Sequence, residues 1–150
     1  MGRPIVPTTI PTIEDCAYVA GFIDGEGCVY VTKGGTRRSG VPRVDVTQVN
    51  VAPLKWLQER WGGGLYFKAN GRDHKYCWVL CISGNRAVQI CEDIRPWLKV
   101  KALQADNVLA FGRTVNRGAH YKLSEEEKDR RKMLVEASRI LNQQAMEVNR

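Results

Sequence analysis

The sequence predicts an α+β protein, because two predicted β-hairpins alternate with helical segments along the chain. Residues 28–33 and 43–49 are rich in strand-forming side chains and flank a glycine-rich loop, which predicts the first hairpin. Residues 65–69 and 75–82 flank a turn that begins with Asn-Gly, and this dipeptide favours a second hairpin. Hairpins of this kind pair into an antiparallel sheet, so we expect the helices to pack behind one face of it.

The helix that precedes the first hairpin has clear start and stop signals. Thr12 and Asp15 have the spacing of a capping box, which predicts that Thr12 is the N-cap. The helical pattern then continues from Ile13 to Asp24 and ends near two glycines. The other predicted helices are residues 51–61, 85–94, 101–111 and 124–143.

Length and composition predict one globular domain spanning residues 1–150. With 43% hydrophobic and 26% charged residues the chain is not a disordered one, and no apolar run reaches the roughly 20 residues of a membrane span. Three prolines predict that residues 1–11 form an irregular N-terminal arm, and residues 113–150 are predicted to be a C-terminal loop and helix. Five cysteines and a start without an apolar signal core predict an intracellular protein with reduced thiols, in the cytoplasm or in an organelle such as a chloroplast or mitochondrion.

The excess positive charge is concentrated in the two predicted hairpins. The chain carries 23 basic and 16 acidic residues, a formal charge of +7, and residues 27–80 alone carry a net charge of +6. Residues 1–26, in contrast, carry a net charge of −3. A clustered basic surface attracts phosphate groups, so nucleic acid is the first partner that the charge pattern predicts.

The end of the first helix combines small residues with two carboxylates. Ala17, Gly21 and Gly25 recur every four residues, so they share a helical face that another backbone can approach closely. Asp24 and Glu26 lie at the C-terminal end, where the helix dipole is already negative and favours a cation. Their oxygens suit Mg²⁺ or Ca²⁺, although a solvated acidic turn is the plainer interpretation of the two residues taken alone.

Residues 17–27, with the sequence AYVAGFIDGEG, resemble the LAGLIDADG motif of homing endonucleases. Three later segments agree with that family in order and spacing. Residues 46–48 are similar to its strand with an active-site glutamine, residues 61–66 to its helix-to-strand turn, and residues 95–101 to its segment ending in an active-site lysine. The resemblance covers roughly residues 13–110, and nothing in the last 40 residues supports it.

The resemblance implies an intron-encoded, site-specific DNA endonuclease whose sheet forms a DNA-binding saddle. In this family two motif helices, here residues 12–26, pack side by side about a two-fold axis. The sequence contains one motif, so the resemblance implies a homodimer with Ala17, Gly21, Asp24 and Gly25 at its interface. It also implies a double-strand break in a pseudo-palindromic double-stranded DNA site, with 3′ overhangs. The lack of a long apolar run predicts no association with membranes.

The resemblance further implies roles for individual residues. Glu26 and the main-chain carbonyl of Gly25 are implied as ligands of Mg²⁺, and Ca²⁺ or Mn²⁺ would occupy the same sites. Gln48 would position water, and Lys101 would stabilise the negative charge that develops on the phosphate. Most family members have aspartate where this chain has Glu26. Without the resemblance, a polar strand end and a surface lysine would equally explain Gln48 and Lys101.

A two-stranded β-ribbon fits the major groove of DNA, and the alternation of side chains nominates one face of the sheet for this contact. Asp45 suits base reading, for example of a cytosine amino group, better than phosphate binding. Tyr76 and Trp78 are open alternatives on the last strand. The candidate DNA-binding residues on the strands are Tyr30, Thr32, Arg43, Asp45, Thr47, Tyr66, Lys68, Asn70 and Lys75, and those at the turn tips are Arg37, Arg38 and Arg72.

Two other functions on the same scaffold stay open at this point. One is an RNA-binding maturase that assists splicing, for which intron RNA is a partner, and the other is a catalytically inactive DNA-binding regulator. The presence of Glu26, Gln48 and Lys101 favours the enzyme over the inactive regulator.

Two packing expectations concern residues outside these motifs. Cys77 and Cys81 are predicted to share a buried sheet face as free thiols. In the charged segment 124–143, Met133, Ile140 and Leu141 are predicted to face the core.

Overall fold

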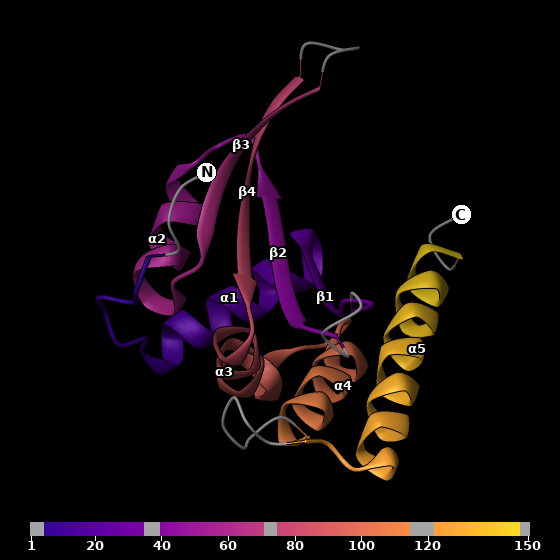
Figure 1. Cartoon of the computed structure of the whole chain (residues 1–150). Helices are drawn as coiled ribbons and strands as arrows, with labels where there is room; N and C mark the ends of the chain where they lie inside the picture. Colours follow the sequence, from indigo (N-terminus) through magenta and orange to yellow (C-terminus); the bar gives the residue numbers. More distant parts are fainter. Residues whose placement is uncertain (1–4, 35–39, 71–74, 115–121, 148–150) are drawn as a thin grey trace.

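The computed structural model describes residues 5–34, 40–70, 75–114 and 122–147, apart from the side chains of residues 70, 75 and 145. It confirms the predicted α+β fold (Figure 1). The helices are α1 (Ile13–Glu26), α2 (Ala52–Trp61), α3 (Asn85–Ile94), α4 (Ala102–Arg113) and α5 (Glu125–Glu147), with a 3₁₀ turn η1 (Arg95–Trp97). The strands are β1 (Gly27–Val31), β2 (Pro42–Gln48), β3 (Gly64–Asn70) and β4 (Lys75–Ser83).

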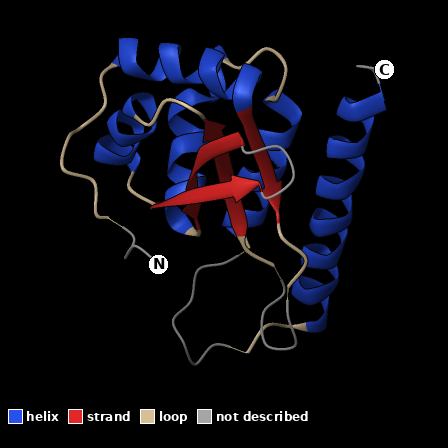
Figure 2. Ribbon diagram, turned by 90° about the horizontal axis from the view of Figure 1, so that it is seen from above, coloured by secondary structure: helices blue, strands red, loops and turns tan. Residues whose placement is uncertain are grey.

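The four strands form one antiparallel sheet in the order β1-β2-β4-β3, so the two hairpins lie side by side. One face of the sheet has an apolar and fully buried centre, where Val29, Val44 and Ile82 are aligned in one row of paired residues. The helices gather on this side in Figure 2, whereas the long helix that ends at the C-terminus stands apart from them. The opposite face of the sheet is therefore available for a ligand.

Helix α1 packs on this core through one buried face. Val19, Ala20 and Ile23 have no exposed surface, and their spacing of one, three and four residues is that of a helical stripe. The stripe directs the C-terminal end of α1 to the start of β1, which follows it without a loop. Within the described residues, no helix combines the length and the apolarity that are needed to cross a membrane.

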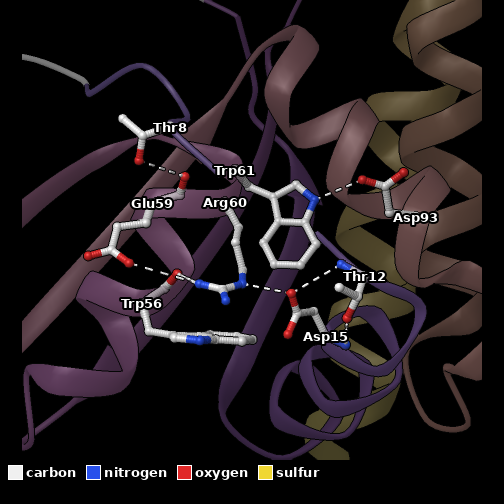
Figure 3. Close-up of polar contacts among 8 residues, drawn as sticks. All are labelled: Thr8, Thr12, Asp15, Trp56, Glu59, Arg60, Trp61 and Asp93. Atoms are coloured by element: carbon white, nitrogen blue, oxygen red, sulfur yellow. Dashed lines mark hydrogen bonds and ion pairs between the residues drawn. The ribbon is translucent and has the colours of Figure 1, made fainter. Parts of the chain in front are cut away.

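The N-terminal end of α1 is stabilised by a network of polar contacts (Figure 3). The amide of Asp15 donates to the Thr12 hydroxyl and the Thr12 amide donates to the Asp15 carboxylate, so the predicted capping box is present. Arg60 of α2 donates to the same carboxylate at 2.8 Å, and its guanidinium lies 3.9 Å from the ring centre of Trp56. The hydrogen bond from Arg60, and then that from Thr12, lower the pKa of Asp15.

The N-terminal arm runs along α2 before it reaches α1. Ile5 forms an isolated antiparallel bridge with Gly63, and the amides of Thr8 and Thr9 both donate to the Glu59 carbonyl. Glu59 lies in the last turn of α2, whose final carbonyl groups have no partner within the helix. The arm therefore helps to cap the C-terminal end of α2.

Helix α5 lies along the free edge of β1 (Figure 1). The Val31 amide donates to the Ser138 hydroxyl at 2.8 Å, and Asn142 donates to the Val29 carbonyl at 3.1 Å. These two side chains occupy backbone groups that an edge strand otherwise offers to another chain.

The predicted orientation of α5 was wrong for Met133 and Ile140, whose side chains are exposed. The helix instead turns Leu134, Val135 and Ser138 toward the core. The physical reason is the long-range bonding to the edge of β1, which a local hydrophobic pattern cannot reveal.

Candidate DNA-cleavage and DNA-binding site

Asp24, near the C-terminal end of α1, joins this helix to the start of α4. Its carboxylate accepts a hydrogen bond from the Lys99 amide at 2.7 Å and another from the Lys101 amide at 2.9 Å. Lys101 is the N-cap residue of α4, whose backbone N–H has no partner within the helix, and Lys99 lies two residues before it. Asp24 therefore fixes the position of residues 99–101 relative to α1.

Lys101 reaches the same helix end with its side chain. Its ammonium group donates to the carbonyl of Ile23 at 2.8 Å and to that of Asp24 at 2.7 Å. Partial burial lowers the pKa of Lys101, while the nearby Asp24, Cys28 and Glu26 act in the opposite direction. A helix C-terminus favours a nearby positive charge, and the Lys101 ammonium group supplies it from within the chain.

Glu26 is the last residue of α1 and is exposed. Among the described residues it has no hydrogen bond or ion pair, in contrast to Asp24 two positions earlier. The described residues contain no group of three or more His, Cys, Asp or Glu side chains that could hold a metal. Among these residues Glu26 is therefore a single candidate ligand and not part of a carboxylate cluster.

Gln48 is the last residue of β2, at the end of the sheet where α1 joins β1. The register pairs Val46 with Gly27, which directly follows Glu26, and Gln48 lies two residues further on the same face. The structure thus brings Glu26 and Lys101 to one helix end and places Gln48 at that end of the sheet. Their catalytic roles stay predictions.

One face of α1 is uncovered along its length. A Cβ atom added at Gly21 or Gly25 would have no atom within 4 Å, so the space beside both glycines is open, and Ala17 on the same face is partly exposed. Ile13 is 71% exposed, and Val100, between the two residues bonded to Asp24, is 67% exposed. Small residues bordered by exposed apolar side chains suit the approach of a second helix.

The sheet face opposite the helices carries most of the predicted DNA-binding residues. Thr47 and Lys68 are exposed. The partly buried residues are Tyr30, Arg43, Asp45 and Tyr66. The Thr32 hydroxyl accepts a hydrogen bond from the Val41 amide. Arg37, Arg38 and Arg72 lie outside the described residues, as do the side chains of Asn70 and Lys75.

The structure shows which side chains of β4 lie on each face of the sheet. Trp78 pairs with Gln48 and Phe67, and alternation from the buried Leu80 places Trp78 and Tyr76 on the helix side of the sheet. Cys77 and Cys81 share the opposite face, as predicted, but both are partly exposed instead of buried. They differ from the expectation because the described helices α1 to α4 pack on the other face of the sheet.

Three side chains around Cys81 form a polar cluster that sequence reasoning missed. The Tyr30 hydroxyl donates to Asp45 at 2.6 Å, and Arg43 lies 3.4 Å from the same carboxylate and 2.6 Å from the Cys81 sulfur. Burial, and then Asp45, raise the pKa of Tyr30 above its usual value and that of Cys81 to about 11. Alternation placed Tyr30, Arg43 and Asp45 on one face, but it gives no signal for these cross-strand bonds.

This architecture, a motif helix that runs into a four-stranded antiparallel sheet, is the fold of the LAGLIDADG homing endonucleases. The comparisons with solved structures confirm the resemblance that the motif indicated. The homing endonuclease I-CvuI, solved with its target in the presence of Ca, is similar with a TM-score of 0.69 and 20% identity, over 86% of this chain and 82% of that one. The archaeal intron-encoded homing endonuclease I-Vdi141I, complexed with DNA, has a TM-score of 0.68 and 20% identity, over 85% and 84%.

A longer chain contains the same fold as one part of its length. The LAGLIDADG homing endonuclease I-GzeII, solved with its DNA target, has a TM-score of 0.63 and 19% identity, over 91% of this chain but 47% of that one. No sequence-family profile and no curated protein sequence matches the chain. The likeness to the solved structures therefore defines the fold.

Proposed function

We propose that this protein is an intron-encoded homing endonuclease that makes a metal-dependent double-strand break in a long pseudo-palindromic DNA site and leaves 3′ overhangs. The observation that carries the proposal is the end of α1, where an exposed Glu26 without a partner among the described residues lies near the ammonium group of Lys101. The fold is shared with homing endonucleases solved bound to DNA, and the sheet face beside this end is polar.

The donors at the end of α1 fit a hard divalent cation. The Glu26 carboxylate and the Gly25 carbonyl would hold Mg²⁺, and Ca²⁺ or Mn²⁺ would fit the same oxygen donors. Once bound, such an ion polarises a phosphate and lowers the pKa of a water molecule that attacks it. Two donors are fewer than these ions require, so DNA phosphates, water and the Glu26 of a second copy would complete the set.

Lys101 and Gln48 would complete the chemistry around the scissile phosphate. Lys101 is held against two carbonyl groups of α1, so its charge is fixed in place before DNA arrives. A preorganised cation of this kind stabilises the negative charge that develops in the transition state. Gln48, at the adjoining end of β2, would orient the attacking water through its side-chain amide.

The uncovered face of α1 supports a homodimer. Close contact of the Ala17, Gly21 and Gly25 faces of two copies would bring their Glu26 residues together at the two-fold axis. Each copy would then contribute to the cleavage of one strand. The two sheets would lie on opposite sides of the axis and contact the two halves of a pseudo-palindromic site.

The proposal is tested with a plasmid that carries the joined flanks of the intron that encodes the protein. We expect Mg²⁺-dependent linearisation, loss of cleavage with a chelator, and 3′ overhangs in the sequenced ends. Analytical ultracentrifugation of the same preparation should show a dimer of the 16.9 kDa chain. The absence of any cleavage, or cleavage of both strands by a stable monomer, would contradict the proposal.

A further inference from the structure

The centre of the DNA-facing sheet carries a cluster of four side chains from three strands. The register aligns Tyr30 with Arg43, and Asp45 with Cys81. Asp45 lies at the middle of the cluster, because one carboxylate oxygen accepts the Tyr30 hydroxyl and the other lies 3.4 Å from Arg43 Nη2. The same Nη2 donates to the Cys81 sulfur at 2.6 Å.

Asp45 is poorly placed to read a base directly. Both of its oxygens already face donors of this chain, and its side chain is only 21% exposed. A cytosine amino group could reach the carboxylate only by displacing Tyr30 or Arg43. The geometry therefore disfavours the base-reading role that the sequence suggested for Asp45.

Arg43 is held in place but its hydrogen-bonding capacity is largely unused. Its Nε is buried and has no partner, and its Nη1 has no hydrogen bond with any described residue. A thiol is a weak acceptor, so the short contact to Cys81 satisfies Nη2 only partly. The Nη1 group therefore keeps its donors for a ligand outside the chain, and the Arg43 side chain is 34% exposed on the DNA side.

We propose that Arg43 reads a guanine in each half of the DNA site, and that Asp45 and Tyr30 position it. This inference rests on the proposed function. Guanine presents two acceptors, N7 and O6, in the major groove, and arginine is the side chain that matches them best. Asp45 restrains the guanidinium electrostatically, while the Tyr30 hydroxyl fixes Asp45 and the Tyr30 ring lies 5.9 Å from the guanidinium carbon.

The two possible roles of Asp45 make different predictions. If Asp45 positions Arg43, then changes at the two residues relax the preference at the same base pair. If Asp45 reads a cytosine itself, each residue controls a different base pair. A contact from Arg43 to a phosphate would instead weaken binding to all sequences equally.

The test is a binding selection from a pool of random DNA duplexes in the presence of Ca²⁺, followed by sequencing. The wild type should enrich a pseudo-palindrome with one guanine in each half that Arg43→Gln no longer selects. Asp45→Asn should relax the same position, each variant losing at least about 5-fold discrimination there, and the double variant should lose no more than Arg43→Gln alone. Lys55→Gln is the control, since it also removes a positive charge but lies exposed on α2, and it should leave that guanine preference intact.

Tyr30→Phe provides a milder second variant if Asp45→Asn fails to fold. It removes only the hydroxyl that Asp45 accepts, and we expect a smaller loss of preference at the same position. The proposal is overturned if Arg43→Gln keeps the full consensus, if Asp45→Asn relaxes a different base pair, or if binding falls equally for all sequences. A wild type that enriches no sequence would instead contradict the proposed function.

Discussion

The two ends of α1 both carry carboxylates, but the helix dipole favours negative charge at only one of them. At the N-terminal end, Asp15 is bonded to Thr12 and to Arg60, and these contacts favour its ionised form. Negative charge is also favourable there because of the helix dipole. Asp15 is therefore explained entirely by its contribution to folding.

The C-terminal end carries acidic residues where the helix dipole disfavours them. Asp24 is compensated by the amides of Lys99 and Lys101, but Glu26 has no such contact among the described residues. Glu26 favours the charged form of Lys101, but no hydrogen bond or ion pair with a described residue holds it in place. A paired carboxylate serves the fold, whereas an unpaired one at an unfavourable site indicates a ligand.

Glu26→Gln gives the largest expected effect on activity. Loss of the carboxylate should reduce DNA cleavage by more than about 100-fold, because a ligand of the cation is removed. The same change removes a negative charge from a helix C-terminus, so the free chain should gain about 0.3–1 kcal/mol of stability. Plasmid cleavage and urea unfolding measure the two effects, and a variant that is both active and less stable would contradict the account.

Lys101→Met should affect both activity and stability. Cleavage should fall by about 100-fold because a preorganised cation is lost near the reacting phosphate. Stability should fall by about 1–2 kcal/mol, because the carbonyls of Ile23 and Asp24 lose a charged donor. Lys101→Arg separates the roles in the same two assays, since it keeps the charge. Unchanged cleavage by Lys101→Met would leave Lys101 with a purely structural role.

Gly21→Leu tests whether the open face of α1 binds a second copy. The new side chain has open space in the single chain, so folding of the monomer should be unaffected or slightly improved. The same side chain would hold two helices apart and weaken the dimer by about 10- to 100-fold. Sedimentation at several concentrations measures this, with Arg130→Leu on α5 as the control. Equal dimerisation of both variants would exclude this face as the interface.

Asp15→Asn has the smallest expected effect, and it is confined to stability. Because the pKa of Asp15 is lowered in the folded chain, its charge stabilises the fold above the usual aspartate value of 3.8. That contribution is lost as the pH falls through the lower pKa of the folded state. The difference in unfolding free energy between wild type and variant should therefore be largest near neutral pH and shrink below pH 3.8. A difference that is independent of pH would show that Arg60 does not stabilise the charge.

The sequence predicted the secondary structure well where the signals are local. The capping box at Thr12 and Asp15 gave the start of α1, and alternating residues gave the four strands. The end of α1 lies two residues beyond the predicted Asp24, because Lys101, distant in sequence, bonds the carbonyls of the last turn. Such a contact has no local signature.

The sequence predicted which residues form the candidate site better than it predicted how those residues are arranged. The family resemblance identified Glu26 in the motif and Lys101 in the segment 95–101, and the structure brings both to one helix end. Alternation placed Asp45 on the correct face, but its bonds to Tyr30 and Arg43 depend on the register of neighbouring strands. Pairing across strands decides whether a side chain is free to contact DNA, and a single sequence does not contain that information.

The most direct test of the account compares the two ends of α1 in one cleavage assay. Wild type, Glu26→Gln and Asp15→Asn would be incubated with Mg²⁺ and the plasmid that carries the joined intron flanks, at a temperature where all three are folded. We predict that Asp15→Asn linearises the plasmid at close to the wild-type rate, while Glu26→Gln leaves it intact. Cleavage by Glu26→Gln at the wild-type rate would contradict the central claim that this unpaired carboxylate is kept for catalysis.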